Sequence, residues 1–273
     1  MMVTITPARL LGLVGAGLLT VLGLSIALHP IPLVFMLHSI QMTPEDPLDV
    51  SPDRFREFVE TLSASRTPAL FTTDSSDRSV YEVYAAVLEH HRQAAVVFLM
   101  PPVIGRPGML TWDQVRELAA RGTIVGSHTL THPWLPDLSN EELRCELCDS
   151  KRRIEKQLGH RITAVAYPYG AFDAGVRRVA VQCGYTQGYA TAPGRKVPDT
   201  DRLAIKRVPL TESVLRTPLL RWLAASEYYV TVREHLLWSV PIDVPRKPAD
   251  WSYSAWQRRV KPDAHNACLT AAD

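Results

Sequence analysis

The sequence predicts an α/β protein built as a (β/α) barrel, complete or incomplete. Short apolar runs alternate with amphipathic helical patterns from Pro32 to about residue 210, and six or seven such units follow one another. Alternation of this kind implies a parallel sheet with right-handed crossovers. A doubly wound open sheet is the alternative, but no glycine-rich phosphate loop follows the first predicted strand.

The predicted strands are short and separated by helical patterns. In chain order they cover residues 33–37, 69–73, 94–100, 123–127, 162–167, 185–190 and 203–208. After Thr211 the alternation fades, although residues 214–237 are compatible with one or two helices.

The predicted helices begin at recognisable capping residues. Three of them open on capping boxes, in which Ser or Thr is followed three positions later by Glu or Gln. These boxes are Ser79 with Glu82, Thr111 with Gln114, and Ser139 with Glu142. The third box predicts a long helix that Gly159 closes. Two further helices are predicted to begin at Pro52 and Asp173.

The N-terminal region predicts membrane targeting. Residues 10–28 (LLGLVGAGLLTVLGLSIAL) carry no charge, and their number is near that needed to cross a bilayer as a helix. One Arg precedes them, and Ser25-Ile26-Ala27 would serve as a cleavage site. We expect residues 1–29 to be a signal anchor or a signal peptide. The barrel is then expected outside the cytoplasm, anchored to the membrane or, if the signal is cleaved, secreted.

Composition sets limits on the rest of the chain. With 273 residues and 46% hydrophobic content, a sizeable core is expected. The formal net charge is +2 and no block of Lys and Arg stands out, so a nucleic-acid partner is not expected. We divide the chain into residues 1–29, a barrel over 30–213, and a C-terminal extension of unknown role over 214–273.

Four cysteines are present. Cys145 and Cys148 form a C-x-x-C inside a strongly helical pattern, where residues three apart share a face. No second C-x-x-C completes a zinc site. We therefore expect both to occupy ordinary helix positions, Cys183 to lie in the core and Cys268 in the tail.

Polar residues follow several of the predicted strands. His38 follows the first, Asp74 the second, His128 and His132 the fourth, and residues 167–170 (YPYG) the fifth. In a barrel the carboxyl ends of the strands meet at one rim, which is where active sites lie. Taken alone, His38 would be a strand-end histidine and Asp74 a turn cap. Their common placement predicts one pocket, with imidazoles that suit Zn, Ni, Co or Fe.

The chain resembles the polysaccharide deacetylase family (NodB homology, carbohydrate esterase family four) over about residues 32–210. The family's first motif, Thr-Phe-Asp-Asp-Gly, corresponds to residues 72–76 (TTDSS). Its second motif, His-Ser/Thr-x-x-His, is residues 128–132 (HTLTH), and its third is YPYG. Residues 33–39 (LVFMLHS) and 206–209 (KRVP) look like the branch that deacetylates poly-N-acetylglucosamine exopolysaccharide.

The resemblance implies a distorted (β/α) barrel that binds one divalent metal (Zn, or Ni, Co or Fe) through Asp-His-His. It implies a hydrolase that removes N-acetyl groups from a polysaccharide, with the metal polarising the carbonyl and activating a water. By position, His128 and His132 would be metal ligands, Asp74 the general base and His38 the general acid. Tyr169 lies in the loop whose backbone would hold the oxyanion.

One departure from the family pattern bears on this expectation. Ser75 stands where the family has its metal-ligand Asp, and Ser76 where it has Gly. Three outcomes are open: Asp74 turns to the metal, Asp77 reaches inward, or the two histidines and waters hold the ion. The alternative function is an inactive protein that binds or guides polysaccharide. A third is an amide hydrolase acting on a small or lipid-linked sugar.

Overall fold

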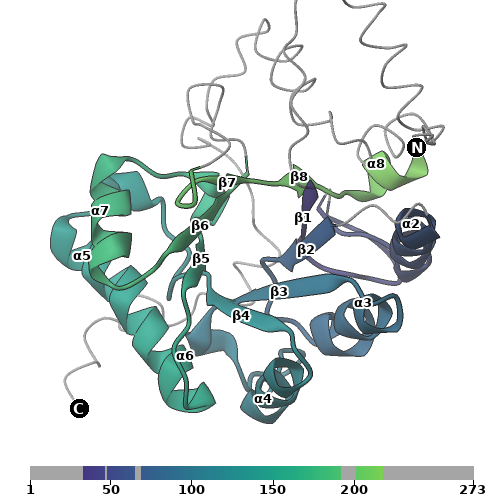
Figure 1. Cartoon of the computed structure of the whole chain (residues 1–273), viewed down its shortest axis with the longest axis horizontal. Coiled ribbons are helices and arrows are strands. Elements are labelled where there is room, and N and C mark those ends of the chain that lie inside the picture. Colours follow the sequence, from purple (N-terminus) through teal and green to yellow (C-terminus); the bar gives the residue numbers. More distant parts are fainter. Residues whose placement is uncertain (1–32, 47, 65–68, 192–200, 218–273) are drawn as a thin grey trace, which may run out of the picture.

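The computed structural model describes residues 33–46, 48–64, 69–191 and 201–217, shown in colour in Figure 1. These residues form one parallel sheet surrounded by helices. The predicted signal segment at residues 10–28 lies outside them, as does the chain after residue 217. Among the described residues, no helix combines the length and the apolar character needed to span a bilayer.

The sheet contains eight strands that pair in parallel. They are β1 (Leu33–Leu37), β2 (Ala69–Thr73), β3 (Ala94–Leu99), β4 (Ile124–Ser127), β5 (Ala164–Ala166), β6 (Gln187–Ala190), β7 (Ile205–Lys206) and β8 (Val208–Pro209). Strands β1 to β7 are neighbours in chain order, and β8 lies beside β1. A doubly wound sheet reverses its strand order at a switch point, so this sequential order excludes that alternative.

The last two strands bring the sheet close to closure. β7 pairs with β6, whereas β8 pairs with β1 at the opposite edge. The predicted single strand over residues 203–208 is therefore two short strands, separated by Arg207. Because one short segment is bonded to both edges, the sheet is a nearly closed, distorted (β/α) barrel, as predicted.

Helices cover the outer face of this sheet (Figure 1). The α-helices are α2 (Pro52–Ala64), α3 (Ala86–His90), α4 (Trp112–Ala120), α5 (Asn140–Arg144), α6 (Ser150–Leu158), α7 (Ala174–Gln182) and α8 (Glu212–Arg216). Two π-helical turns, η1 (Val80–Ala85) and η4 (Cys145–Asp149), precede α3 and α6. Three short 3-10 turns are η2 (Pro101–Val103), η3 (Leu135–Asp137) and η5 (Pro168–Gly170). Helix α8 crosses residue 213, the predicted end of the barrel domain. The division into domains stays a prediction.

The strands separate two hydrophobic cores, because successive side chains point to opposite faces of a sheet. The larger core lies between sheet and helices and contains Phe35, Phe55 and Phe71 in ring contact. The smaller core consists of Val34, Val96, Phe98, Ala164, Ala166 and Tyr189. It fills the barrel interior. Gly126 belongs to this inner packing, since a Cβ there would lie 2.6 Å from the Phe98 ring.

Two of the three predicted capping boxes are confirmed, at Thr111 and Ser139. The box predicted at Ser79 is wrong. Ser79 has helical backbone angles (φ −60°, ψ −22°), and its side chain makes no capping bond. Its N–H and hydroxyl donate to Asp77 Oδ1 instead. The chain therefore turns into the helix earlier than the pattern indicated, and Asp77 does the capping.

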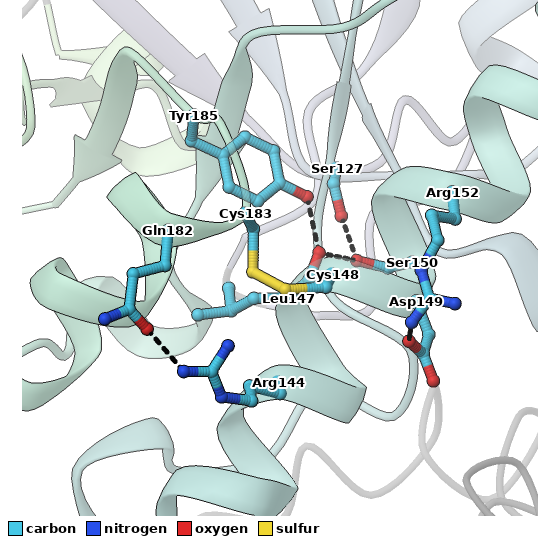
Figure 2. The surroundings of a disulfide bond; sticks show 10 residues. All are labelled: Ser127, Arg144, Leu147, Cys148, Asp149, Ser150, Arg152, Gln182, Cys183 and Tyr185. Atoms are coloured by element: carbon cyan, nitrogen blue, oxygen red, sulfur yellow. Dashed lines mark hydrogen bonds and ion pairs between the residues drawn. A yellow bond between two sulfur atoms is a disulfide. The ribbon is translucent and has the colours of Figure 1, made fainter.

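The sequence pattern placed Cys148 on a helix and Cys183 in the core and did not indicate that the two pair. The two form a disulfide with their Cα atoms 5.0 Å apart, which joins η4 to the end of α7 (Figure 2). They are 35 residues apart in the sequence. Only the packing of the long helix against α7 brings them together, so spacing alone did not reveal the pair.

Candidate functional site

The predicted site residues come together at the carboxyl rim of the barrel. His38 follows β1, Asp74 follows β2 and His128 follows β4. In sequence, each lies two or four residues beyond an inward-facing position, so the pleat directs their side chains into the barrel mouth. The strand ends are tied together: Asp74 N–H donates to the Leu37 carbonyl (3.1 Å), and the Thr73 hydroxyl to the His38 carbonyl (2.9 Å).

Asp74 is held by a buried arginine. Arg207 Nη1 donates to Asp74 Oδ1 (2.6 Å) and Nη2 donates to Oδ2 (2.8 Å), so both carboxylate oxygens are engaged. Asp74 is 6% exposed and Arg207 is 1% exposed. The guanidinium carbon of Arg207 lies 5.7 Å from the centre of the Phe98 ring, which supports it from inside the barrel.

The ion pair fixes the protonation state of Asp74. Burial alone would raise its pKa, but the charge and hydrogen bonds of Arg207, together with His128, hold the pKa well below its usual range. Asp74 is therefore a carboxylate at neutral pH. Its low basicity follows from the same contacts.

His128 presents a free nitrogen to Asp74. Its Nδ1–H donates to the Ala166 carbonyl (2.9 Å), which leaves the lone pair on Nε2. Nε2 lies 3.9 Å from Asp74 Oδ2 and has no hydrogen-bond partner among the described residues. Burial lowers the pKa of His128, although Asp74 opposes this. The imidazole is thus neutral and able to act as an acceptor or a ligand.

His132 and Tyr169 complete this side of the mouth. The His132 ring lies 4.7 Å from the His128 ring and 4.7 Å from the Tyr169 ring, centre to centre. Trp134 lies 5.6 Å from Tyr169 in the same way. Burial lowers the pKa of His132 well below its ordinary value, and the neighbouring His128 lowers it further. The rim therefore carries two neutral imidazoles beside two half-buried aromatic rings.

His38 follows β1 at the same rim and is within electrostatic reach of Asp74 and His128. Burial lowers the pKa of its imidazole to about 4, and the charge of Arg207 adds to that effect while Asp74 opposes it. His38 is therefore neutral at pH 7. All five predicted site residues lie at one rim, and their catalytic roles stay predictions.

Ser75 and Asp77 are engaged with each other rather than with the site. Ser75 Oγ donates to Asp77 Oδ2 (2.6 Å), and the N–H of Asp77 donates back to Ser75 Oγ (3.2 Å). Asp77 Oδ1 accepts the N–H of Ser79 (2.8 Å). Asp77 therefore closes the turn and does not reach inward, which removes one of the three outcomes considered above.

The comparisons with known proteins agree with this geometry. Residues 62–188 match the profile of the family described as Polysaccharide deacetylase, and this range includes Asp74, His128, His132 and Tyr169. The chain contains a polysaccharide deacetylase domain. A Bacillus subtilis protein named as a polysaccharide deacetylase, YxkH, is 30% identical over 139 residues, which is 51% of this chain and 50% of YxkH. The chain thus spans about half the length of that relative.

Solved structures of deacetylases share the fold of the domain. Streptococcus pyogenes deacetylase PplD, solved in complex with acetate, has a TM-score of 0.63 at 20% identity, covering 75% of this chain and 98% of PplD. IcaB from Ammonifex degensii has a TM-score of 0.60 at 20% identity, covering 72% of this chain and 98% of IcaB. At these identities the similarity establishes the fold alone.

Deacetylases of this family generally depend on a divalent metal. The deacetylase domain of this chain offers the two imidazoles of His128 and His132. The Ser75 hydroxyl is directed to Asp77, and Arg207 engages both oxygens of Asp74. In the part of the chain that the structure describes, no three His, Cys, Asp or Glu side chains are grouped to hold a metal ion. These residues do not fit the Asp-His-His set that the resemblance implies.

One cavity of the deacetylase domain lies away from this rim. It has a volume of about 310 Å³ and is lined by residues that include Ala94, Ala95 and Thr123, at the amino ends of β3 and β4. Parallel strands place this cavity at the opposite end of the barrel. It has no part in the site described above.

Two residues of the site were missed by the sequence analysis. Arg207 was noticed only as part of a resemblance, although an arginine inside an apolar strand segment indicates a buried carboxylate partner. The sequence did not indicate that Glu146 is buried, because an acidic residue in a helical pattern normally faces solvent. In the structure it is 4% exposed and contacts the loop of residues 128–132.

Proposed function

We propose that this protein is a polysaccharide N-deacetylase, which hydrolyses N-acetyl groups of an N-acetylglucosamine-type glycan. The observation that carries the proposal is the convergence of Asp74, His128 and His132 at the carboxyl rim of a deacetylase domain. A buried carboxylate beside two neutral imidazoles is a set of groups suited to moving protons and binding a polar substrate.

Asp74 and His38 are the proposed proton carriers. Asp74, ionised at neutral pH, takes a proton from the attacking water, and Arg207 fixes the direction of its two oxygens. His38, neutral at rest, receives that proton and passes it to the nitrogen of the amide. The carbonyl carbon gains the water oxygen, the C–N bond breaks, and the amine leaves with the proton from His38. The acetic acid that forms releases its remaining proton to solvent, so the products are acetate and a free amine on the sugar.

The loop of Tyr169 is proposed to hold the oxygen of the carbonyl as negative charge develops on it. Its backbone turns sharply, with Tyr169 in the left-handed region (φ 59°, ψ 6°), and its ring contacts His132. Such strain is found where a site needs a fixed geometry. No step is assigned to a metal, because the described side chains lack a third ligand.

A second candidate function is binding of N-acetylated polysaccharide without turnover. The contact between Ser75 and Asp77 favours it, since a charged metal ligand is replaced by a hydroxyl that is already engaged. The bidentate contact of Arg207 with Asp74 also favours it, because a carboxylate with so low a pKa is a weak base.

We also propose that the domain works outside the cytoplasm, attached to a membrane through residues 10–28. The Cys148–Cys183 disulfide supports this location, because disulfides persist in oxidising compartments. We further propose that the substrate belongs to the poly-N-acetylglucosamine class. The resemblance of the LVFMLHS and KRVP segments to that branch supports this choice.

The test is release of acetate from an N-acetylglucosamine oligomer, measured with the full chain alone and with added Zn²⁺, Co²⁺ or Ni²⁺. Wild-type release that is lost in His128→Ala supports the deacetylase. If only Ser75→Asp releases acetate, the second candidate is correct and the wild-type site is a binding site. No release and no oligomer binding by either protein would overturn both candidates.

A further inference from the structure

The segment η4 interrupts an otherwise continuous helix at the back of the site. Residues Cys145–Asp149 form a π-helical turn between α5 and α6. A π turn inserts one residue into an α-helix and changes which side chains face inward, and such turns occur frequently at functional sites. Here it places Glu146 and Leu147 on the buried side.

The carboxylate of Glu146 holds the centre of the histidine loop, residues 128–132. Its Oε2 accepts the N–H groups of Leu130 (2.8 Å) and Thr131 (3.0 Å), and its Oε1 accepts the Thr131 hydroxyl (2.6 Å). Glu146 is 4% exposed and forms no salt bridge with a described residue. This buried charge is therefore stabilised by hydrogen bonds from the loop itself.

The loop needs such support because its backbone is strained. Thr129 (φ 68°) and His132 (φ 56°) both lie in the left-handed region, which residues with a side chain seldom adopt. These two strained positions set the directions of His128 and His132. Strained backbone of this kind persists only where the surroundings determine it.

The same turn is fastened on its other side. Cys148 is bonded to Cys183, and the Tyr185 hydroxyl donates to the Leu147 carbonyl (2.9 Å), as Figure 2 shows. Figure 2 also shows the Ser127 and Ser150 hydroxyls in contact (2.7 Å), which links the strand before the loop to the residue after the turn. The turn thus joins α7 and β4 to the histidine loop.

We propose that Glu146 is a positioning residue for His128 and His132, and that the Cys148–Cys183 disulfide holds the turn that presents it. The inference rests on the proposed function in one respect, namely that the two histidines face the substrate. Glu146 itself does not touch the reacting atoms. It sets the directions of the imidazoles through the loop backbone.

The test compares three substitutions in the full chain: Glu146→Ala, Glu146→Gln and, as a matched control, the exposed Glu141→Ala on α5. Amide hydrogen exchange at Leu130 and Thr131 and the imidazole NMR signals of the site are measured. Glu146→Ala is expected to speed exchange at both amides by at least about tenfold and to shift the imidazole signals, while exchange in β2 and β3 is unchanged.

Glu146→Gln separates positioning from charge. Its oxygen still accepts the two N–H groups, and its NH₂ donates to the Thr131 hydroxyl, so it should restore most of the protection lost in Glu146→Ala. The control should behave as wild type. If Glu146→Ala leaves both amides and the imidazole signals unchanged, or if Gln behaves as Ala does, the positioning role is wrong. Thr131→Val, which removes one donor, replaces Glu146→Ala if that protein does not fold.

The disulfide is tested with Cys148→Ala/Cys183→Ala and with wild type treated with dithiothreitol. Both should speed exchange at Leu130 and Thr131 more than in β2 and β3. Unchanged protection at the two amides would overturn that part of the proposal. None of these measurements requires turnover, so a protein that releases no acetate still tests the inference. Where acetate release is found, Glu146→Ala should lower kcat with little change in KM.

Discussion

The two loops that form the site are held in opposite ways. The loop after β2, residues 74–77, is satisfied by its own side chains and by one cation: Ser75 bonds to Asp77, and Arg207 engages both oxygens of Asp74. The loop after β4, residues 128–132, is held from a distant helix by Glu146, and His128 Nε2 is left without a hydrogen bond among the described residues.

The difference between the loops suggests that one mainly stabilises the fold and the other mainly binds a ligand. Buried polar groups are normally hydrogen-bonded, so a buried nitrogen without a partner indicates a place for a ligand or a water. Both oxygens of Asp74 in the first loop already accept hydrogen bonds from Arg207, whereas His128 Nε2 in the second loop accepts none from the described residues. We therefore expect substitutions in the first loop and its partner to affect folding first, and those around the second to affect the geometry of the imidazoles first.

The largest effect is expected for Arg207→Leu. It leaves Asp74 as a buried carboxylate without its cation, and breaking a buried ion pair costs about 3–5 kcal/mol. Urea unfolding monitored by circular dichroism measures the loss. The matched control is Arg202→Leu, because Arg202 is exposed and should cost little.

A double variant sharpens this test. Arg207→Leu with Asp74→Asn removes the buried charge as well and should recover part of the lost stability. If Arg207→Leu lowers the free energy of unfolding no more than the Arg202 control does, the ion pair does not hold the first loop. The proposed difference between the two loops is then wrong.

The Arg207–Asp74 ion pair also shows which contacts cannot be predicted from the sequence. Asp74 and His128 were predictable because polar residues directly after apolar strands meet at one rim of a barrel. Arg207 lies 133 residues from Asp74, and only closure of the barrel by β7 and β8 brings them together.

Two further features depended on packing rather than on local pattern. The Cys148–Cys183 pair depends on α7 lying against the long helix, and the burial of Glu146 depends on a π turn that the helical pattern did not indicate. The cap at Ser79 failed for a local reason: Asp77 accepts the Ser79 N–H that Glu82 would have accepted, and the N–H groups of Tyr81 and Glu82 donate to the Arg78 carbonyl. Strand and helix positions were therefore accessible from the sequence, while contacts between distant elements were not.

Removing the disulfide is expected to have the next largest effect. Cys148→Ala/Cys183→Ala removes a disulfide between residues 35 apart in the sequence. Loss of such a bridge lowers the free energy of unfolding by about 2–4 kcal/mol. Thermal unfolding of the oxidised wild type and of the variant measures it. Because the bridge supports the second loop alone, its cost should add to that of Arg207→Leu. A clearly non-additive double variant would mean that the two loops are one unit.

Gly126→Ala tests whether the packing of β4 against Phe98 couples the two loops. A Cβ at this position would lie 2.6 Å from the Phe98 ring and 2.9 Å from the Ala164 carbonyl oxygen. Overpacking of this kind costs about 1–3 kcal/mol. Since Phe98 lies under Arg207, the substitution on the strand of the second loop should also disturb the first. Unchanged stability in urea unfolding would show that the barrel interior accommodates the methyl group.

A smaller effect is expected for Ser75→Ala, which removes the two hydrogen bonds between the Ser75 hydroxyl and Asp77, each worth about 0.5–1.5 kcal/mol in urea unfolding. The same variant decides what the Ser75 hydroxyl does. If it serves only the turn, binding of Co²⁺ or Zn²⁺, followed by titration calorimetry, will be the same in wild type and Ser75→Ala. If it contributes to an ion at His128 and His132, the alanine variant will bind the ion more weakly. The first loop would then resemble the second in having an atom available to a ligand, because Ser75 Oγ would leave Asp77 and bind the ion.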